Sequence, residues 1–290
     1  MGNAMPATKL ILLEGIPGSG KSTAGLYLET FLKKKGLPVK FWHEGDFDNP
    51  ADFEGIACLN AAQYRNLIAR HPGNAGLIDQ QLTVRGEDHL IQYRKLQSLH
   101  PEKIPSKLIV ELSGYDVYDG LPMQDYCRLA LQRWQHFQNS AAQSDEITIL
   151  ECCFLQNPLT VMLARHNAGP QLAYEQVEKV ACLLEPLAPL VIYLKPRDVK
   201  GALLHVREQR SREWADFVTW YITGQAYGEA HGLEGYGGVI HFYKLRQSLE
   251  ADLLHALSIQ SRVVEHTGME WDRCYAEIAA FVSPFLETQL

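Results

Sequence analysis

The residues with the clearest chemical potential lie near the start of the chain, where a glycine-rich loop follows an apolar run. Four apolar residues, 10–13, lead into the spacing Gly-x-x-x-x-Gly-Lys-Ser, and a helix-forming run follows it. A strand, this spacing and a helix together are typical of a loop that binds nucleotide phosphates. The alternative is a glycine-rich turn that binds nothing. The residues expected to contact the nucleotide are Gly15, Ile16, Pro17, Gly18, Ser19, Gly20, Lys21, Ser22 and Thr23.

Each residue type in this loop has a physical reason to be there. The three glycines allow backbone conformations that a Cβ atom forbids, so that successive N–H groups can point at phosphate oxygens. Lys21 stands at the start of the following helix, where its ammonium adds to the positive end of the helix dipole. Ser22 offers a hydroxyl to Mg²⁺, which takes few protein ligands and keeps several waters. The loop therefore predicts ATP and Mg²⁺ as cofactors.

Polar residues follow the strand-like run 39–42, and a second strand-like run, 147–151, ends in the carboxylate Glu151. Because ligands bind outside the carboxyl ends of parallel strands, we expect these residues to face the same crevice as the loop. Glu44 or Glu151 would orient or deprotonate an acceptor hydroxyl, and Glu151 would also assist Ser22 in holding Mg²⁺. His43 and Asp46 would contact the substrate. The alternative is that the carboxylates are solvated or pair with local amides.

Two arginines form a second group of candidate catalytic residues. Asp198 can cap a helix that runs to Arg207 and Arg210, and two residues three apart share a helix face. Guanidinium groups stabilise the charge of a phosphoryl group in transfer. The alternative is an ordinary solvated helix. We expect a lid within residues 198–245.

The elements that must position these side chains follow from hydrophobic periodicity. Residues 190–194 and 262–265 predict two more strands, and Trp271–Phe285 predicts a closing helix. We expect one domain over residues 1–290, with a mostly helical cap inserted at 48–106. Residues 107–112 suit either a strand or the start of a helix. The Gly- and Tyr-rich stretch at 224–238 has the composition of a mobile segment.

Composition narrows the functional class. A net charge of −7 argues against a polynucleotide as the main ligand, because backbone phosphates are bound by Lys and Arg. The six cysteines show no metal-ligand spacing and are expected to be reduced. No apolar run approaches the length of a membrane span, and Met1–Lys9 lacks the pattern of a leader. We therefore expect a cytoplasmic protein that binds no membrane.

The loop and its surroundings resemble the amino-terminal third of thymidylate kinases and deoxynucleoside kinases. The likeness lies in Glu14-Gly15 before the loop, the acidic turn 43–46, and the lid-like arginines. It implies that Glu44 lies near the acceptor and that Glu151 is the acidic residue ending the third strand. Cys152 follows Glu151 where that family has arginine, and the insertion has no counterpart. The resemblance covers about half of the chain.

The resemblance also implies an α/β phosphate-loop NTPase fold, in which helices flank a five-stranded parallel sheet of order 2-3-1-4-5. The expected neighbours, in spatial order, are strands 39–42, 147–151, 10–14, 190–194 and 262–265.

The function that these residues favour is transfer of the ATP γ-phosphoryl group to a small-molecule acceptor. One alternative is a nucleotide-binding regulator or slow ATPase, in which the segment 224–238 is ordered by nucleotide and meets a protein partner. Another is a kinase of polynucleotide ends, which the acidic charge disfavours. A homodimer is an open alternative to a single chain. The acceptor and the choice between ATP and GTP also stay open, although no Asn-Lys-x-Asp string selects guanine.

Overall fold

The computed structural model describes residues 7–286, and these form two compact units. The first unit contains the chain up to Glu44 and again from Leu131 onward, and the second contains Gly45–Ala130. Residues 1–6, which bear on the expectation of no leader, lie outside the described part. No helix in the described part combines the length and the apolar character needed to cross a membrane.

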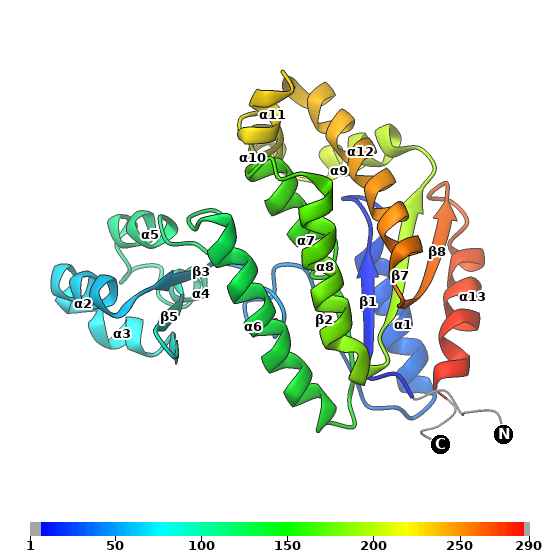
Figure 1. The fold of residues 1–290 in the computed structure, drawn as a ribbon, viewed down its shortest axis with the longest axis horizontal. Coiled ribbons are helices and arrows are strands. Elements are labelled where there is room, and N and C mark those ends of the chain that lie inside the picture. The colour runs from blue at the N-terminus through cyan, green and yellow to red at the C-terminus, as the bar shows by residue number, and fades with distance from the viewer. Residues whose placement is uncertain (1–6, 287–290) are drawn as a thin grey trace. The chain divides into compact units, whose positions relative to one another are not determined.

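The first unit is built on a parallel sheet of five strands (Figure 1). All four strand pairs are parallel, and the expected neighbours are confirmed. The insertion adds three strands that the sequence did not predict, so the labels along the chain differ from the predicted numbering. In spatial order the strands are β2 (Val39–Trp42), β6 (Ile147–Glu151), β1 (Leu10–Glu14), β7 (Leu190–Pro196) and β8 (Gln260–His266).

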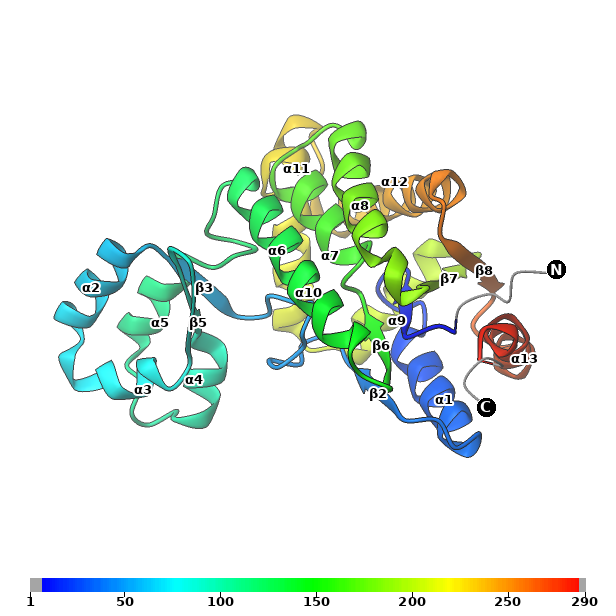
Figure 2. The ribbon, with the colours of Figure 1, turned by 60° about the horizontal axis from the view of Figure 1, so that its bottom comes forward.

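Helices cover both faces of this sheet. Because side chains alternate along a strand, Ile11 and Leu13 face one side and pack against apolar residues of α1 and α13. On the other face, the Tyr193 hydroxyl of β7 donates to Glu250 of α12. Helices α8 and α12 lie side by side in both views (Figures 1 and 2), and the Tyr174 hydroxyl donates to the Leu249 carbonyl at 3.1 Å.

The helices of this unit follow the strands in chain order. A π-helix, Thr160–Arg165, continues α7, and short 3₁₀ turns follow α8 and α13 at Glu185–Leu187 and Ser283–Phe285. Helix α6 begins in the second unit and ends in the first. The α-helices are α1 (Lys21–Lys34), α6 (Met123–Ala142), α7 (Gln156–Leu159), α8 (Pro170–Leu184), α9 (Val199–Gln209), α10 (Arg212–Thr223), α11 (Ala226–Ala230), α12 (Gly235–Ala256) and α13 (Trp271–Val282).

The second unit corrects the expectation of a mostly helical insertion. It contains an antiparallel sheet of order β3-β5-β4, made of β3 (Ile56–Leu59), β4 (Leu82–Arg85) and β5 (Asp88–Gln92). The strands escaped prediction because each is only four or five residues long, and β3 is buried throughout and so shows no alternation. Its helices are α2 (Ala61–Arg70), the 3₁₀ turn Pro72–Asn74, α3 (Ala75–Asp79), α4 (Tyr93–Leu99) and α5 (Ser106–Ser113).

Two further stretches are decided by the structure. Residues 107–112 belong to helix α5, which resolves the choice between strand and helix. The stretch 224–238 is largely helical rather than irregular. Two of its glycines are closely packed: a Cβ at Gly228 would lie 2.4 Å from the Ile222 carbonyl oxygen, and one at Gly238 would lie 2.9 Å from the Leu233 Cβ. Composition alone indicated a mobile segment, because it cannot distinguish a glycine that gives the backbone flexibility from one that allows close packing.

Candidate functional site

The glycine-rich loop connects the carboxyl end of β1 to helix α1. Gly15, Gly18 and Gly20 have φ angles of 142°, 78° and 86°, in the region that favours glycine. A Cβ at Gly20 would lie 2.1 Å from the Trp271 ring, and one at Gly15 would lie 2.4 Å from the Leu194 carbonyl oxygen. The loop therefore needs glycine at these positions both for its backbone and for its neighbours.

The Lys21 side chain is buried at the base of this loop. Its ammonium donates to the Gly15 and Ile16 carbonyls, both at 3.1 Å, and to Gln156 Oε1 at 3.0 Å. An ammonium has three N–H donors, so all of them are used. Burial works to lower the pKa of Lys21, but interactions with Cys152 and Glu44 outweigh it and raise the pKa above its ordinary value. The ammonium stays charged, and a phosphate oxygen could bind it only by replacing one of its three acceptors.

Gln156 joins the loop lysine to the acidic turn. This nearly buried side chain accepts from Lys21 through Oε1, and its Nε2 donates to Glu44 Oε1 at 2.7 Å. The two backbone carbonyls that also bind Lys21 are held in the loop, whereas the Gln156 amide can rotate. The sequence analysis missed this residue, and its only signal was its place five residues after Glu151, where helix α7 begins.

The structure brings Ser22, Glu44, Glu151 and His43 together at the carboxyl edge of the sheet. Ser22 Oγ donates to Glu151 Oε1 at 2.7 Å, and the Glu44 N–H donates to Glu151 Oε2 at 3.5 Å. His43 Nδ1 lies 3.9 Å from the same Oε2. Glu151 is buried and Glu44 is exposed, so the two carboxylates have different environments although they are neighbours.

Glu14, the last residue of β1, holds the β6–α7 loop and the first residue of α7 in place. Its carboxylate is fully buried and accepts from the Phe154 and Gln156 N–H groups at 2.8 and 2.9 Å. Burial raises the pKa of Glu14 to about 7, and the two N–H donors offset part of that rise. The phosphate loop and the β6–α7 loop are thereby tied through one carboxylate.

Cys152 is the residue that replaces arginine in the resemblance, and its backbone is unusual. Its φ of 69° places a side chain with a Cβ in the left-handed region. The thiol is fully buried, and burial together with Glu44 raises its pKa well above the ordinary value. One ligand atom from each of Glu44, Glu151 and Cys152 lies within 4.8 Å of the others. The sequence analysis expected only a reduced thiol here, because the cysteines show no metal-ligand spacing.

The two arginines are not placed as expected. Arg207 is in the last turn of α9, with its guanidinium 4.6 Å from the centre of the Tyr236 ring. Arg210 follows the end of that helix, with an extended backbone (φ −96°, ψ 165°). The prediction that they share a helix face is therefore wrong, because the helix stops at Gln209 and a new one begins at Arg212. Both arginines are exposed.

The remaining predicted residues differ in exposure and in the unit to which they belong. Pro17 and Gly18 are accessible within the loop, and Thr23 is exposed in the first turn of α1. The Ser19 hydroxyl is buried and has no hydrogen-bond partner among residues 7–286. Asp46 belongs to the second unit.

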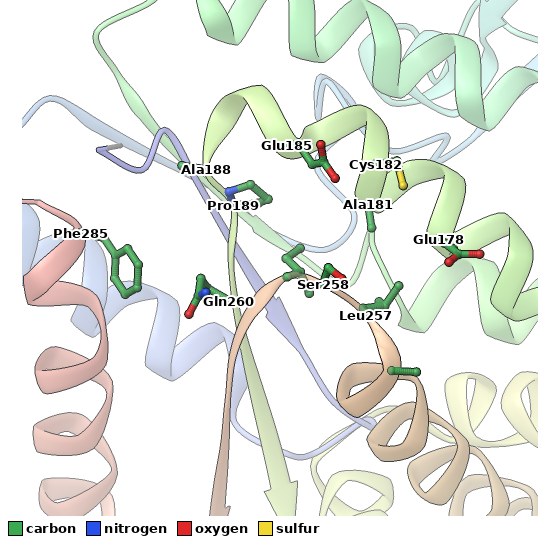
Figure 3. Close-up of a pocket in the computed structure, with 12 residues that line it drawn as sticks. Glu178, Ala181, Cys182, Glu185, Ala188, Pro189, Leu257, Ser258, Gln260 and Phe285 are labelled. Atoms are coloured by element: carbon green, nitrogen blue, oxygen red, sulfur yellow. The ribbon is translucent and has the colours of Figure 1, made fainter. Parts of the chain in front are cut away.

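The first unit also has a hollow away from the phosphate loop. A cavity of about 430 Å³ opens at the amino ends of β7 and β8, next to Pro189 and Gln260 (Figure 3). Figure 3 shows Glu178, Cys182 and Glu185, from α8 and the turn after it, among the residues that line it. The phosphate loop follows the carboxyl end of β1, so this cavity is at the opposite edge of the sheet. Ligands of such sheets bind at the carboxyl edge.

The parallel sheet, its strand order and the loop after β1 define a phosphate-loop NTPase fold, a nucleotide-binding fold. No protein-family model matches the chain, and no curated protein matches it. Among solved structures, the chain is similar to thymidylate kinase from Candida albicans, with 15% identity over 96% of this chain and 94% of that one and a TM-score of 0.43. It is also similar to TT1252 from Thermus thermophilus, with 15% identity over 96% of this chain and 98% of that one and a TM-score of 0.31.

Proposed function

We propose that the protein transfers the γ-phosphoryl group of ATP to a hydroxyl of a small-molecule acceptor. The observation that carries the proposal is the chain of contacts from Lys21 through Gln156 to Glu44. It connects the group that would hold the transferring phosphate to the one exposed carboxylate of the cluster. Phosphoryl transfer depends on such positioning and on electrostatic stabilisation rather than on covalent chemistry.

We assign the two carboxylates different roles because their environments differ. Glu151 is buried and accepts from Ser22, so it would position that hydroxyl. Glu44 is exposed and would accept the proton of the acceptor hydroxyl. His43 and Asp46 remain proposed substrate contacts. Arg207 and Arg210 do not share a helix face. As long, exposed side chains, they would still reach the charge that develops on the phosphoryl group.

The oxygen donors of the site fit Mg²⁺. Ser22 Oγ lies within hydrogen-bond distance of Glu151, and the buried, unpartnered Ser19 hydroxyl lies in the same loop. Ser22 and Glu151 would hold the ion, Ser22 directly and Glu151 through water. When bound, Mg²⁺ would neutralise phosphate charge.

The test is acceptor-stimulated release of ADP from labelled MgATP, measured against pools of nucleosides, nucleotides, sugars and aminoglycosides. One pool should raise ADP release, and Lys21→Ala should abolish the increase. Glu44→Gln should lower it by about 10²–10⁴-fold, the usual contribution of a general base. Glu29→Gln is the matched control, because Glu29 pairs with Lys33 on the exposed side of α1.

Other results would overturn the proposal. If no metabolite pool raises ADP release but a protein partner does, the chain is a nucleotide-dependent switch. If only oligonucleotide ends raise it, the acceptor is a polynucleotide. If Lys21→Ala keeps full turnover, the phosphate loop does not carry the reaction.

A further inference from the structure

The cluster of Glu44, Glu151 and Cys152 contains one donor that a magnesium site does not use. Mg²⁺ selects oxygen ligands, whereas thiolates select softer ions such as Zn²⁺. The Cys152 thiol is fully buried beside two carboxylates, and among residues 7–286 no hydrogen bond engages its sulfur. It is also held in a left-handed backbone conformation, which is strained for a residue with a Cβ. A buried thiol in this position is not explained by phosphate or magnesium binding.

The spacing of the three donors suits a single ion. Around a tetrahedral ion with bonds of about 2.0–2.3 Å, neighbouring donors are roughly 3.5 Å apart. The three ligand atoms already lie within 4.8 Å of one another, so small rotations of the side chains would close them around an ion. Glu44 is exposed and provides the route of entry.

The charges of the cluster balance when an ion is bound. Two carboxylates and a thiolate carry three negative charges, and the neighbouring Lys21 ammonium, which interacts with all three groups, supplies one positive charge. A divalent cation supplies the remaining two. The thiol proton is released to water when the sulfur–metal bond forms.

We propose that Glu44, Glu151 and Cys152 form a binding site for a thiophilic divalent cation of the Zn²⁺ class in the nucleotide-free protein. The site does not depend on the proposed function. One consequence does: an ion that holds both carboxylates removes them from phosphoryl transfer, so such a cation acts as a reversible inhibitor.

The test titrates Cd²⁺ into the reduced, full-length, nucleotide-free protein and follows the ultraviolet charge-transfer absorption of cadmium–thiolate bonds together with the heat of binding. Cys152→Gly removes the thiol and also suits the left-handed backbone, so the fold is retained. This variant should lose the absorption at the tight site, and its affinity should fall at least ~10-fold. Glu44→Gln should weaken binding but keep the absorption.

Two cysteines provide matched controls. Cys153 is the adjacent buried cysteine, whose sulfur donates to the Glu151 carbonyl at 3.1 Å, and Cys182 is exposed on α8. Cys153→Ser and Cys182→Ser should keep the tight absorption. If Cys152→Gly keeps it, or if either control loses it, the assignment is overturned.

Turnover separates this proposal from the proposed function. In the presence of MgATP and an acceptor, low Zn²⁺ should inhibit the wild type more strongly than Cys152→Gly. Tight Cd²⁺ binding without any acceptor-stimulated turnover would support the metal site and contradict the kinase. Acceptor-stimulated turnover without Cys152-dependent Cd²⁺ binding would support the kinase and contradict the metal site.

Discussion

Replacing Gln156 by leucine tests the link between the phosphate loop and the acidic turn. In the resting protein Gln156 occupies the third donor of Lys21 and also holds Glu44. Leucine fills a similar volume but forms neither hydrogen bond. A hydrogen bond to a charged group contributes about 1.5–3 kcal/mol.

The two lost bonds should affect different measurements. A phosphate oxygen no longer has to displace the amide from Lys21, so nucleotide should bind up to ~10-fold more tightly, which corresponds to about 1.4 kcal/mol. Glu44 loses the donor that orients it, so kcat should fall about 10- to 100-fold, for a loss of about 1.4–2.7 kcal/mol. The dissociation constant and kcat therefore move in a pattern that general damage to the fold does not produce.

Gln156→Glu should shift nucleotide affinity in the opposite direction. Its carboxylate would pair with the Lys21 ammonium more strongly than the amide does and would repel Glu44, so nucleotide should bind more weakly than to the wild type.

The assay combines calorimetric titration of MgADP with steady-state ADP release. Gln171→Leu is the matched control, because Gln171 also donates to a carboxylate, that of Glu175, but on an exposed helix. Weaker nucleotide binding to the leucine variant with unchanged kcat would refute the reasoning.

Three further predictions concern stability. In denaturant titrations, Gly20→Ala should lower the free energy of unfolding by about 1–3 kcal/mol or more, and Gly36→Ala by only about 1 kcal/mol. Both glycines have positive φ, but only a Cβ at Gly20 would meet a ring, that of Trp271. The raised pKa of Glu14 means that the folded state holds a proton between about pH 4.5 and 7 that the unfolded state has lost. Wild-type stability should therefore fall by up to about 3 kcal/mol as pH rises through this window, and Glu14→Gln should show a smaller fall. Arg246→Met leaves the fully buried Glu250 without its cation and should lower the free energy of unfolding by about 3–5 kcal/mol. The double variant Arg246→Met, Glu250→Leu should recover most of that loss, as measured by thermal unfolding. The first expectation is contradicted if the two glycine variants lose equal stability, and the second if wild type and Glu14→Gln have the same pH profile of stability. The third is contradicted if the double variant is no more stable than Arg246→Met alone.

The sheet and the phosphate loop could be predicted because their determinants are local. A run such as 190–194 is apolar and bounded by prolines, and the loop spacing restricts the backbone by itself. The prediction for the insertion was wrong because its determinants are not local. Strands of four or five residues have too few positions for a period to show, and their pairing depends on neighbours distant in sequence. The end of α9 at Gln209 likewise depends on the break at Ser211, which periodicity alone did not reveal.

The sequence by itself determined that a phosphate loop follows a buried strand, that Glu44 lies in the turn after a second strand, and that Glu151 ends a third. Only the tertiary structure decided which groups meet there. Gln156 reaches Lys21 across 135 positions of the chain, and Cys152 joins the two carboxylates through a left-handed backbone. Contacts of this kind depend on how separate elements pack, and no local pattern of residue types encodes them.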